Sequence, residues 1–147
     1  MPSRYYSGNA LKYTFLNLID FGFAHRYRNK DKTHCAQEDV NVFRGNIMFS
    51  SRDQLNFLRT SRKDDLESLM YLLLYFLSDG VLLGLRIKEI GAIAPIEALN
   101  VIQKIKTNTS IDEMCTGRAL LLKPFCEEIL KIRYYEEPNY EKLKSVL

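Results

Sequence analysis

Tryptophan is absent from this 147-residue chain, and proline (4), glycine (7) and cysteine (3) are scarce. So little glycine and proline excludes a collagen-like or low-complexity chain. The cysteines Cys35, Cys115 and Cys126 are widely spaced and form no C-x-x-C pair, which argues against a disulfide framework or a structural zinc site. We therefore expect free thiols in a reducing, intracellular compartment, the cytoplasm or the nucleus. The adjacent His34 and Cys35 are interpreted as part of an ordinary polar loop rather than as a metal pair.

Long apolar runs are also lacking. The longest, residues 69–77, has nine residues, whereas a membrane-spanning helix needs about 20. Residues 1–9 are polar and hold no apolar signal-peptide core. The net charge of +3 is too mild to require nucleic acid as a partner. We expect no membrane and no nucleic acid, and instead a protein substrate or protein partner. The sequence carries no signal for the oligomeric state.

What is present suits a folded protein. The chain is 46% hydrophobic and 27% charged, which excludes a disordered polypeptide. No repeat and no flexible linker divides it, so residues 1–147 are predicted to form a single domain, long enough to bury a core. Residues 11–19 (LKYTFLNLI) are rich in β-branched and aromatic residues and predict a strand that stops at Asp20. Residues 24–46 are polar and predict a long loop.

The second half predicts helices. Ser61 and Asp64 form a capping box, and leucines recur at helical spacing up to residue 77, where Ser78-Asp79-Gly80 predicts the stop. Because this helix is apolar on all faces, we expect it to be buried at the centre. Further helices are predicted from Pro95, from Ser110, over residues 119–132 with a late start or a kink at Pro124, and after Asn139. The predicted fold is mainly α with a small β element at its start, an α+β class.

The Asp20-Phe21-Gly22 motif directly follows the predicted strand. The same arrangement holds Mg²⁺ against nucleotide phosphates in protein kinases. A carboxylate suits this hard cation, and glycine allows a sharp turn. Alone, the tripeptide is a weak signal, because it also occurs by chance as a turn that closes a strand.

Three ordered segments strengthen the signal. Residues 18–28 (LIDFGFAHRYR), 61–76 (SRKDDLESLMYLLLYF) and 133–143 (RYYEEPNYEKL) resemble the casein kinase I family of Ser/Thr protein kinases. The resemblance covers residues 18–147 and thins between 80 and 109. It implies the helical C-terminal lobe of a kinase, with the D-F-G motif and activation segment over 20–51 and a helical core over 61–147. A helical domain with a fortuitous D-F-G is the remote alternative.

The resemblance implies roles for single residues. Asp20 would bind Mg²⁺, and Phe21 and Gly22 would complete the nucleotide-facing turn. Gly45, Asn46, Met48 and Ser50 would belong to a substrate platform. Met48 stands where the family has a phosphate-binding arginine, and an apolar side chain cannot bind an anion. Asp65 would anchor the catalytic loop, with a simple helix N-terminal charge as the compatible alternative, and Arg133 would brace the lobe.

Several kinase parts are not found in this sequence. No G-x-G-x-x-G occurs, and neither His25 nor His34 begins an H-R-D motif. The upper lobe and the catalytic loop are therefore missing, and a general base would have to lie upstream. Phosphoryl transfer needs several groups acting together. We therefore expect a kinase fragment that is inactive alone and binds the implied ATP and Mg²⁺ poorly. A pseudokinase-type binding or scaffold module is the alternative.

The loop at residues 25–34 (HRYRNKDKTH) is the most basic stretch of the chain. Four of its residues are Lys or Arg, and a single acid accompanies them. It is interpreted as a solvated activation loop. Docking of an acidic substrate or of nucleic acid phosphates is the alternative.

Overall fold

The structure is a computed structural model that describes residues 17–147. In this part of the chain the helices are α1 (Arg52–Leu55), α2 (Arg62–Leu77), α3 (Ile87–Ile90), α4 (Pro95–Asn108), α5 (Ile111–Met114), the 3-10 helix η2 (Gly117–Leu122), α6 (Lys123–Lys131) and α7 (Tyr140–Ser145). No helix among these residues is both long and apolar enough to cross a bilayer.

The small β element predicted at the start is not shown. Residues 11–16 of the predicted strand lie outside the described residues, and residues 17–19 form no strand. Within 17–147, β pairing is limited to isolated bridges, among them Arg28 with His34 and Asp39 with Leu58. The described part therefore consists of helices joined by long loops, which agrees with the mainly α prediction, and most of the predicted strand lies outside the described residues.

Helix α2 begins and ends where the sequence predicts. Ser61 is its N-cap, and the predicted capping box with Asp64 is present. At the other end the Gly80 backbone N–H donates to the Tyr75 carbonyl at 3.0 Å. Asp79, with φ 52°, takes the left-handed position in this closing turn. Both ends of the central helix are thus set by local chemistry.

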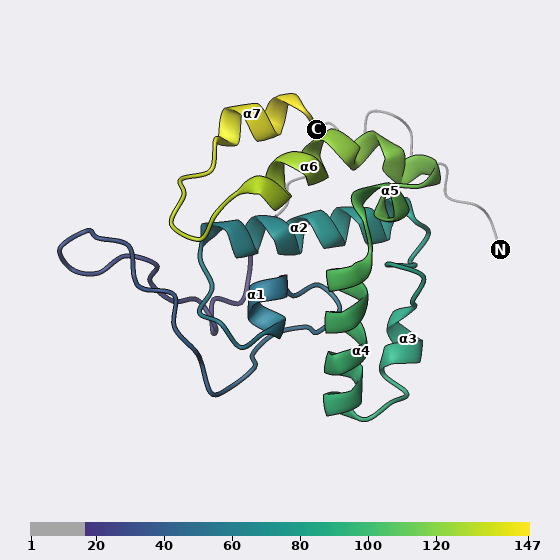
Figure 1. Cartoon of the computed structure of the whole chain (residues 1–147), viewed down its shortest axis with the longest axis horizontal. Coiled ribbons are helices and arrows are strands. Elements are labelled where there is room, and N and C mark those ends of the chain that lie inside the picture. The colour runs from purple at the N-terminus through teal and green to yellow at the C-terminus, as the bar shows by residue number, and fades with distance from the viewer. Residues whose placement is uncertain (1–16) are drawn as a thin grey trace.

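Helix α2 lies between two groups of helices (Figure 1): α6 and α7 lie on one side and α1 on the other, while α4 runs across it. Its buried face carries Met70, Tyr71 and Leu74. The prediction of a helix buried on all faces is wrong in part, because Leu69 is 41% and Phe76 63% exposed. Burial follows the packing of neighbouring elements, and an apolar side chain stays exposed where none covers it.

The remaining helices match the predictions closely. Helix α4 has Pro95 in its first turn, and α5 follows Ser110, which forms a capping box with Glu113. The segment predicted over 119–132 is divided, since η2 precedes α6 and Pro124 stands in the first turn of α6. Asn139 caps α7 as expected. Helices α1 and α3, of four residues each, were not predicted.

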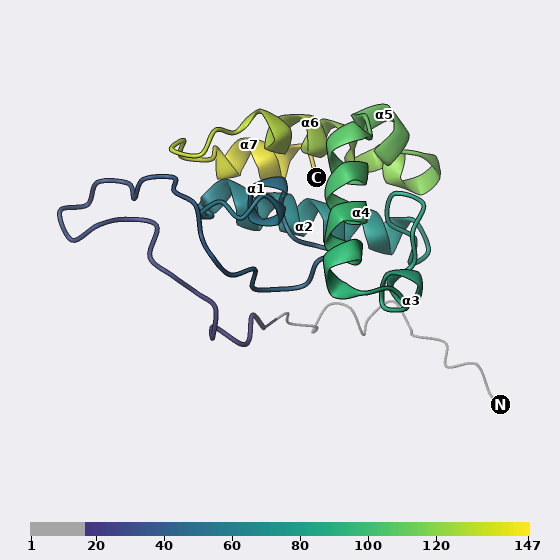
Figure 2. The ribbon, with the colours of Figure 1, turned by 60° about the horizontal axis from the view of Figure 1, so that its bottom comes forward.

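The core gathers around α2. It joins the buried face of α2 to Leu55 of α1, Ile102 of α4, and Phe125 and Ile129 of α6. Removal of this apolar surface from water is the main force that holds the helices together. The polar segment of residues 24–46, coloured purple to blue, extends away from the helices (Figures 1 and 2).

Candidate functional site

The Asp20-Phe21-Gly22 motif lies on the surface. Asp20 has φ 61°, and its Oδ1 accepts the backbone N–H of Gly22 at 3.2 Å. The carboxylate therefore closes the turn of its own motif. Phe21 is 65% exposed. The cofactor role of these residues is not tested by their position and stays a prediction.

Asp20 fits one part of a magnesium site. Its carboxylate is a hard oxygen ligand, and Mg²⁺ is commonly held by one or two carboxylates together with substrate phosphates. Among residues 17–147, no group of three or more His, Cys, Asp or Glu side chains is placed to hold a metal ion.

A groove of about 390 Å³ lies beside the motif, lined by residues 22–25, 38, 40–44, 54 and 58–60. Its backbone is tied by the Val40 N–H, which donates to the Phe57 carbonyl at 2.7 Å. The Arg59 side chain donates to the Glu38 carboxylate at 2.5 Å and so links the same two segments, residues 38–40 and 57–59. Exposed Phe23 adds an apolar wall. The groove therefore presents apolar surface beside an ion pair.

The four predicted platform residues occupy one turn but differ in exposure. Gly45 and Asn46 are exposed, whereas Met48 is 2% and Ser50 3% exposed. A buried side chain cannot contact a substrate directly. Met48 instead belongs to the core, which is where an apolar residue at this position is stable. The platform role stays a prediction and, in this geometry, falls to the exposed residues and the backbone.

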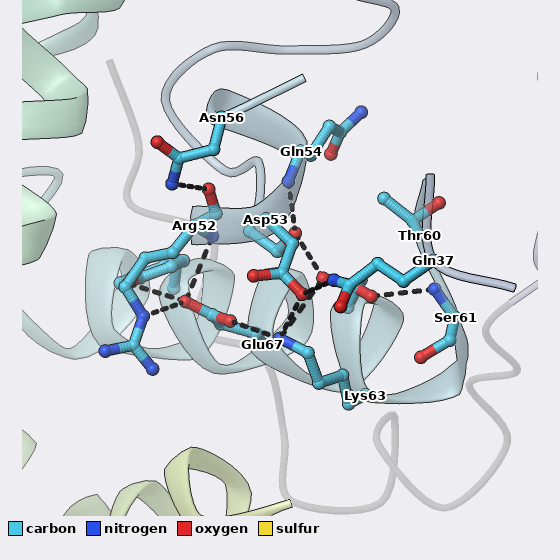
Figure 3. Close-up of polar contacts among 12 residues, drawn as sticks. Gln37, Arg52, Asp53, Gln54, Asn56, Thr60, Ser61, Lys63 and Glu67 are labelled. Carbon is cyan, nitrogen blue, oxygen red and sulfur yellow. Dashed lines mark hydrogen bonds and ion pairs between the residues drawn. The ribbon is translucent and has the colours of Figure 1, made fainter. Parts of the chain in front are cut away.

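A buried polar network holds α1 against α2 (Figure 3). Asp64 accepts the Ser51 hydroxyl at 2.6 Å and the Ser61 backbone N–H at 2.7 Å. Burial raises the pKa of Asp64, while the Ser51 hydrogen bond and the charge of Lys63 oppose that rise. Lys63 also lies 2.9 Å from Asp53 on α1. Burial works against the charge of Lys63, but these acids together raise its pKa.

Glu67 is the second buried acid of this network and is 2% exposed. It accepts Arg52 Nε at 2.8 Å and the Tyr71 hydroxyl at 3.1 Å. Burial, followed by the charge of Glu67, raises the pKa of the Tyr71 phenol, so that Tyr71 stays a neutral donor. Paired in this way, the two acids and their basic partners join α1, α2 and the segment before α1 into one unit.

Lys106 of α4 lies next to this network and contacts Tyr71 and Ser50. Its ammonium donates to the Ser50 carbonyl at 2.5 Å and lies 3.7 Å from the centre of the Tyr71 ring. The side chain is 1% exposed. Burial lowers the pKa of Lys106 to about 7, although the nearby Glu67 favours its charged form. A lysine is rarely so buried, and here it is held by one carbonyl and one ring.

The two predicted anchors are placed outside this network. Asp65 is on the exposed face of α2. Arg133 is also exposed, and its backbone N–H donates to Glu136. Neither position tests the predicted roles. Tyr134, next to Arg133, donates to the Ala36 carbonyl at 3.3 Å. Arg62, at the start of α2, lies 4.7 Å from the ring centre of Tyr27 in the basic loop.

The basic loop forms a hairpin around its tip. The Cys35 N–H donates to the Tyr27 carbonyl at 2.8 Å, and the Asp31 carboxylate accepts the Thr33 hydroxyl. His34 packs between aromatic rings of the loop and of the C-terminal motif. Its Nδ1 lies 2.8 Å from the Cys35 carbonyl.

Glu67 and Lys106 are the polar residues that sequence reasoning missed. Glu67 did carry a signal: with Asp64, Tyr71 and Leu74 it follows the 3–4-residue spacing of one helical face, the face that is buried. An acid on the buried face of a helix indicates a buried partner. Lys106 carried none, because its partners come from elements 35 and 56 residues earlier in the chain.

No family model matches the chain. The chain is similar to a probable casein kinase I homolog of Encephalitozoon cuniculi (strain GB-M1), with 31% identity over 133 residues. The aligned region covers 88% of this chain and 40% of that relative. The chain is kinase-like in sequence. It spans less than half the length of this relative, and its helical architecture is consistent with the C-terminal lobe that the resemblance implies.

Proposed function

We propose that this chain forms part of the helical lobe of a Ser/Thr protein kinase similar to casein kinase I. Such an enzyme transfers the γ-phosphoryl group of ATP to a protein hydroxyl. The observation that supports this is a set of contacts among the three motif segments. The first segment contacts the start of the second, and the third contacts the chain between the first two. His25, which follows the D-F-G motif, lies 3.2 Å from the Thr60 carbonyl at the start of α2. Tyr134 of the closing motif contacts Ala36.

In this proposal each part of the site has a separate task. Asp20 would supply one oxygen ligand to Mg²⁺, whose chemistry there would be to neutralise charge on the nucleotide phosphates. The groove beside the motif accepts an extended segment of the protein substrate. The buried network of Asp64 and Glu67 keeps the segment before α1 in place. The general base and the upper-lobe groups belong to parts that this sequence does not contain, so the chain alone transfers no phosphate.

A chimera tests the proposal directly. The aligned 133-residue region of the Encephalitozoon relative is replaced by this chain, and transfer from Mg²⁺-ATP to a Ser-containing peptide is measured alongside the intact relative. We expect the chimera to transfer phosphate. Asp20→Ala should lower kcat by about 100-fold or more, because a metal-binding carboxylate is lost. The matched Asp39→Ala removes an exposed acid that is outside the groove and should leave kcat unchanged.

The alternative is a non-catalytic binding module, which would use the same groove without nucleotide. A chimera that is folded by circular dichroism but transfers no phosphate, next to an active relative, refutes the kinase proposal and favours this module. Equal kcat in the Asp20→Ala and Asp39→Ala variants refutes the assigned role of Asp20.

A further inference from the structure

The turn at residues 45–50 has its own internal hydrogen bonds. The Asn46 Oδ1 accepts the Met48 N–H at 2.9 Å. The Asn46 carbonyl accepts the Ser50 N–H at 3.0 Å and the Ser50 hydroxyl at 2.7 Å. These bonds determine the shape of the turn. Because they all lie within it, they do not determine its position relative to the helices.

The burial of Met48 in the core and the hydrogen bond of Ser51 to Asp64 contribute to that position, and helix α4 adds two side-chain hydrogen bonds. Lys106 donates to the Ser50 carbonyl, and Gln103 donates to the Asn56 Oδ1, both at 2.5 Å. Residues three apart share one face of a helix. Ser50 precedes α1 and Asn56 follows it, so this face of α4 contacts the chain on both sides of α1. The resemblance to known kinases is weakest over residues 80–109, and nothing in it assigns a role to either side chain.

The chemistry of Lys106 indicates a role other than stability. Burying an ammonium is costly, and an apolar side chain of similar length generally gives equal or greater stability at such a site. What a methionine cannot do is donate to a particular carbonyl. The hydrogen bond selects one position of Ser50, and Tyr71 beneath the ammonium restricts its approach. The hydrogen bond from Lys106 to Ser50 depends on direction, whereas apolar packing does not.

We propose that Lys106 and Gln103 are positioning residues that place the 45–50 turn and the following α1 for binding of a peptide substrate. That the turn contacts a substrate rests on the proposed function. That α4 positions the turn rests on the hydrogen bonds alone. The two parts therefore have separate tests.

The first test is amide hydrogen exchange on the whole chain, without nucleotide. Lys106→Met should speed exchange in residues 46–50 at least tenfold, while amides of α6 exchange as in the wild type. Gln103→Leu should speed exchange near Asn56 more than in 46–50, which keeps the proposal testable if Lys106→Met does not fold. Lys104→Met, an exposed lysine of the same helix, is the control and should change neither region. Unchanged exchange in both regions, or equal acceleration throughout the protein, overturns the positioning role.

The second test measures peptide and nucleotide affinity on the chimera described above. Lys106→Met should raise the Kd for a Ser-containing peptide at least tenfold and leave the Kd for an ATP analogue unchanged, a split that general destabilisation does not produce. Equal peptide Kd values in variant and wild type overturn the substrate part of the inference. A chimera that binds no peptide at all contradicts the proposed function, while the exchange result still decides the role of α4.

Discussion

Lys106 should make the free energy of unfolding depend on pH near neutrality. The ordinary lysine pKa is 10.5, and burial lowers that of Lys106 to about 7 in the folded protein. Between these two values the unfolded chain binds a proton that the folded chain lacks. Stability therefore rises with pH in that window and is lowest below pH 7, where both states carry the proton. The charged groups that face Lys106 are Glu67, which favours the proton, and Arg52, which opposes it.

The size of the effect follows from the proton count. At pH 7 the folded protein is about half protonated at this site, and by pH 8.5 it is almost fully deprotonated, while the unfolded chain stays protonated. Integrating the difference at about 1.36 kcal/mol per pH unit gives about 1.5 kcal/mol of added stability over this range. That is a large part of the stability of a typical small domain, about 5–15 kcal/mol.

Urea unfolding followed by circular dichroism at pH 7.0 and 8.5 measures this gain. The wild type and Lys104→Met should both gain about 1.5 kcal/mol, and Lys106→Met should gain nothing from this site. Burial also raises the pKa of Cys115 and Cys126, which acts in the opposite direction but equally in all three proteins. If Lys106→Met shows the same gain as the wild type, the assignment of the proton to Lys106 is wrong.

Further predictions concern the helical core and the anchors. Glu67→Ala should cost about 1–3 kcal/mol in urea unfolding, because it leaves the buried Tyr71 hydroxyl without its acceptor, whereas Asp65→Ala should change stability by less than about 0.5 kcal/mol; similar losses would contradict the network. Leu74→Ala, at 1% exposure, should cost about 2–5 kcal/mol by the same measurement, and a loss below about 1 kcal/mol would mean that this part of the core is loosely packed. Arg62→Ala should speed trypsin cleavage within residues 26–32 more than Arg133→Ala does, because Arg62 contacts the Tyr27 ring; the reverse order would contradict this and support the bracing role predicted for Arg133.

Helix ends were predictable because their chemistry is local. The capping boxes of α2 and α5, the proline in the first turn of α4 and the Asn139 cap of α7 each involve residues within one turn of the chain. The kinase-like relationship could also be predicted from the sequence, since three ordered segments carry it. The short helices α1 and α3 were not predicted, because four residues hold too little periodicity to distinguish a helix from a turn.

Burial, by contrast, was decided only by tertiary structure. The sequence made α2 apolar on every face, but the helices pack on only part of it, so that Leu69 and Phe76 stay exposed. Met48 was predicted to belong to the substrate platform, but the turn directs its side chain into the core. Exposure depends on which elements meet, and no local pattern contains that information.

The polar connections show the same division. The sequence by itself determined the longer helices, their caps and the family resemblance, because propensity, capping and motif order act over short stretches of chain. Only the tertiary structure brought Lys106 to Ser50, 56 residues away, and to the ring of Tyr71. A buried charge is tolerated only where partners from distant segments converge on it, and that convergence exists only once the helices have packed.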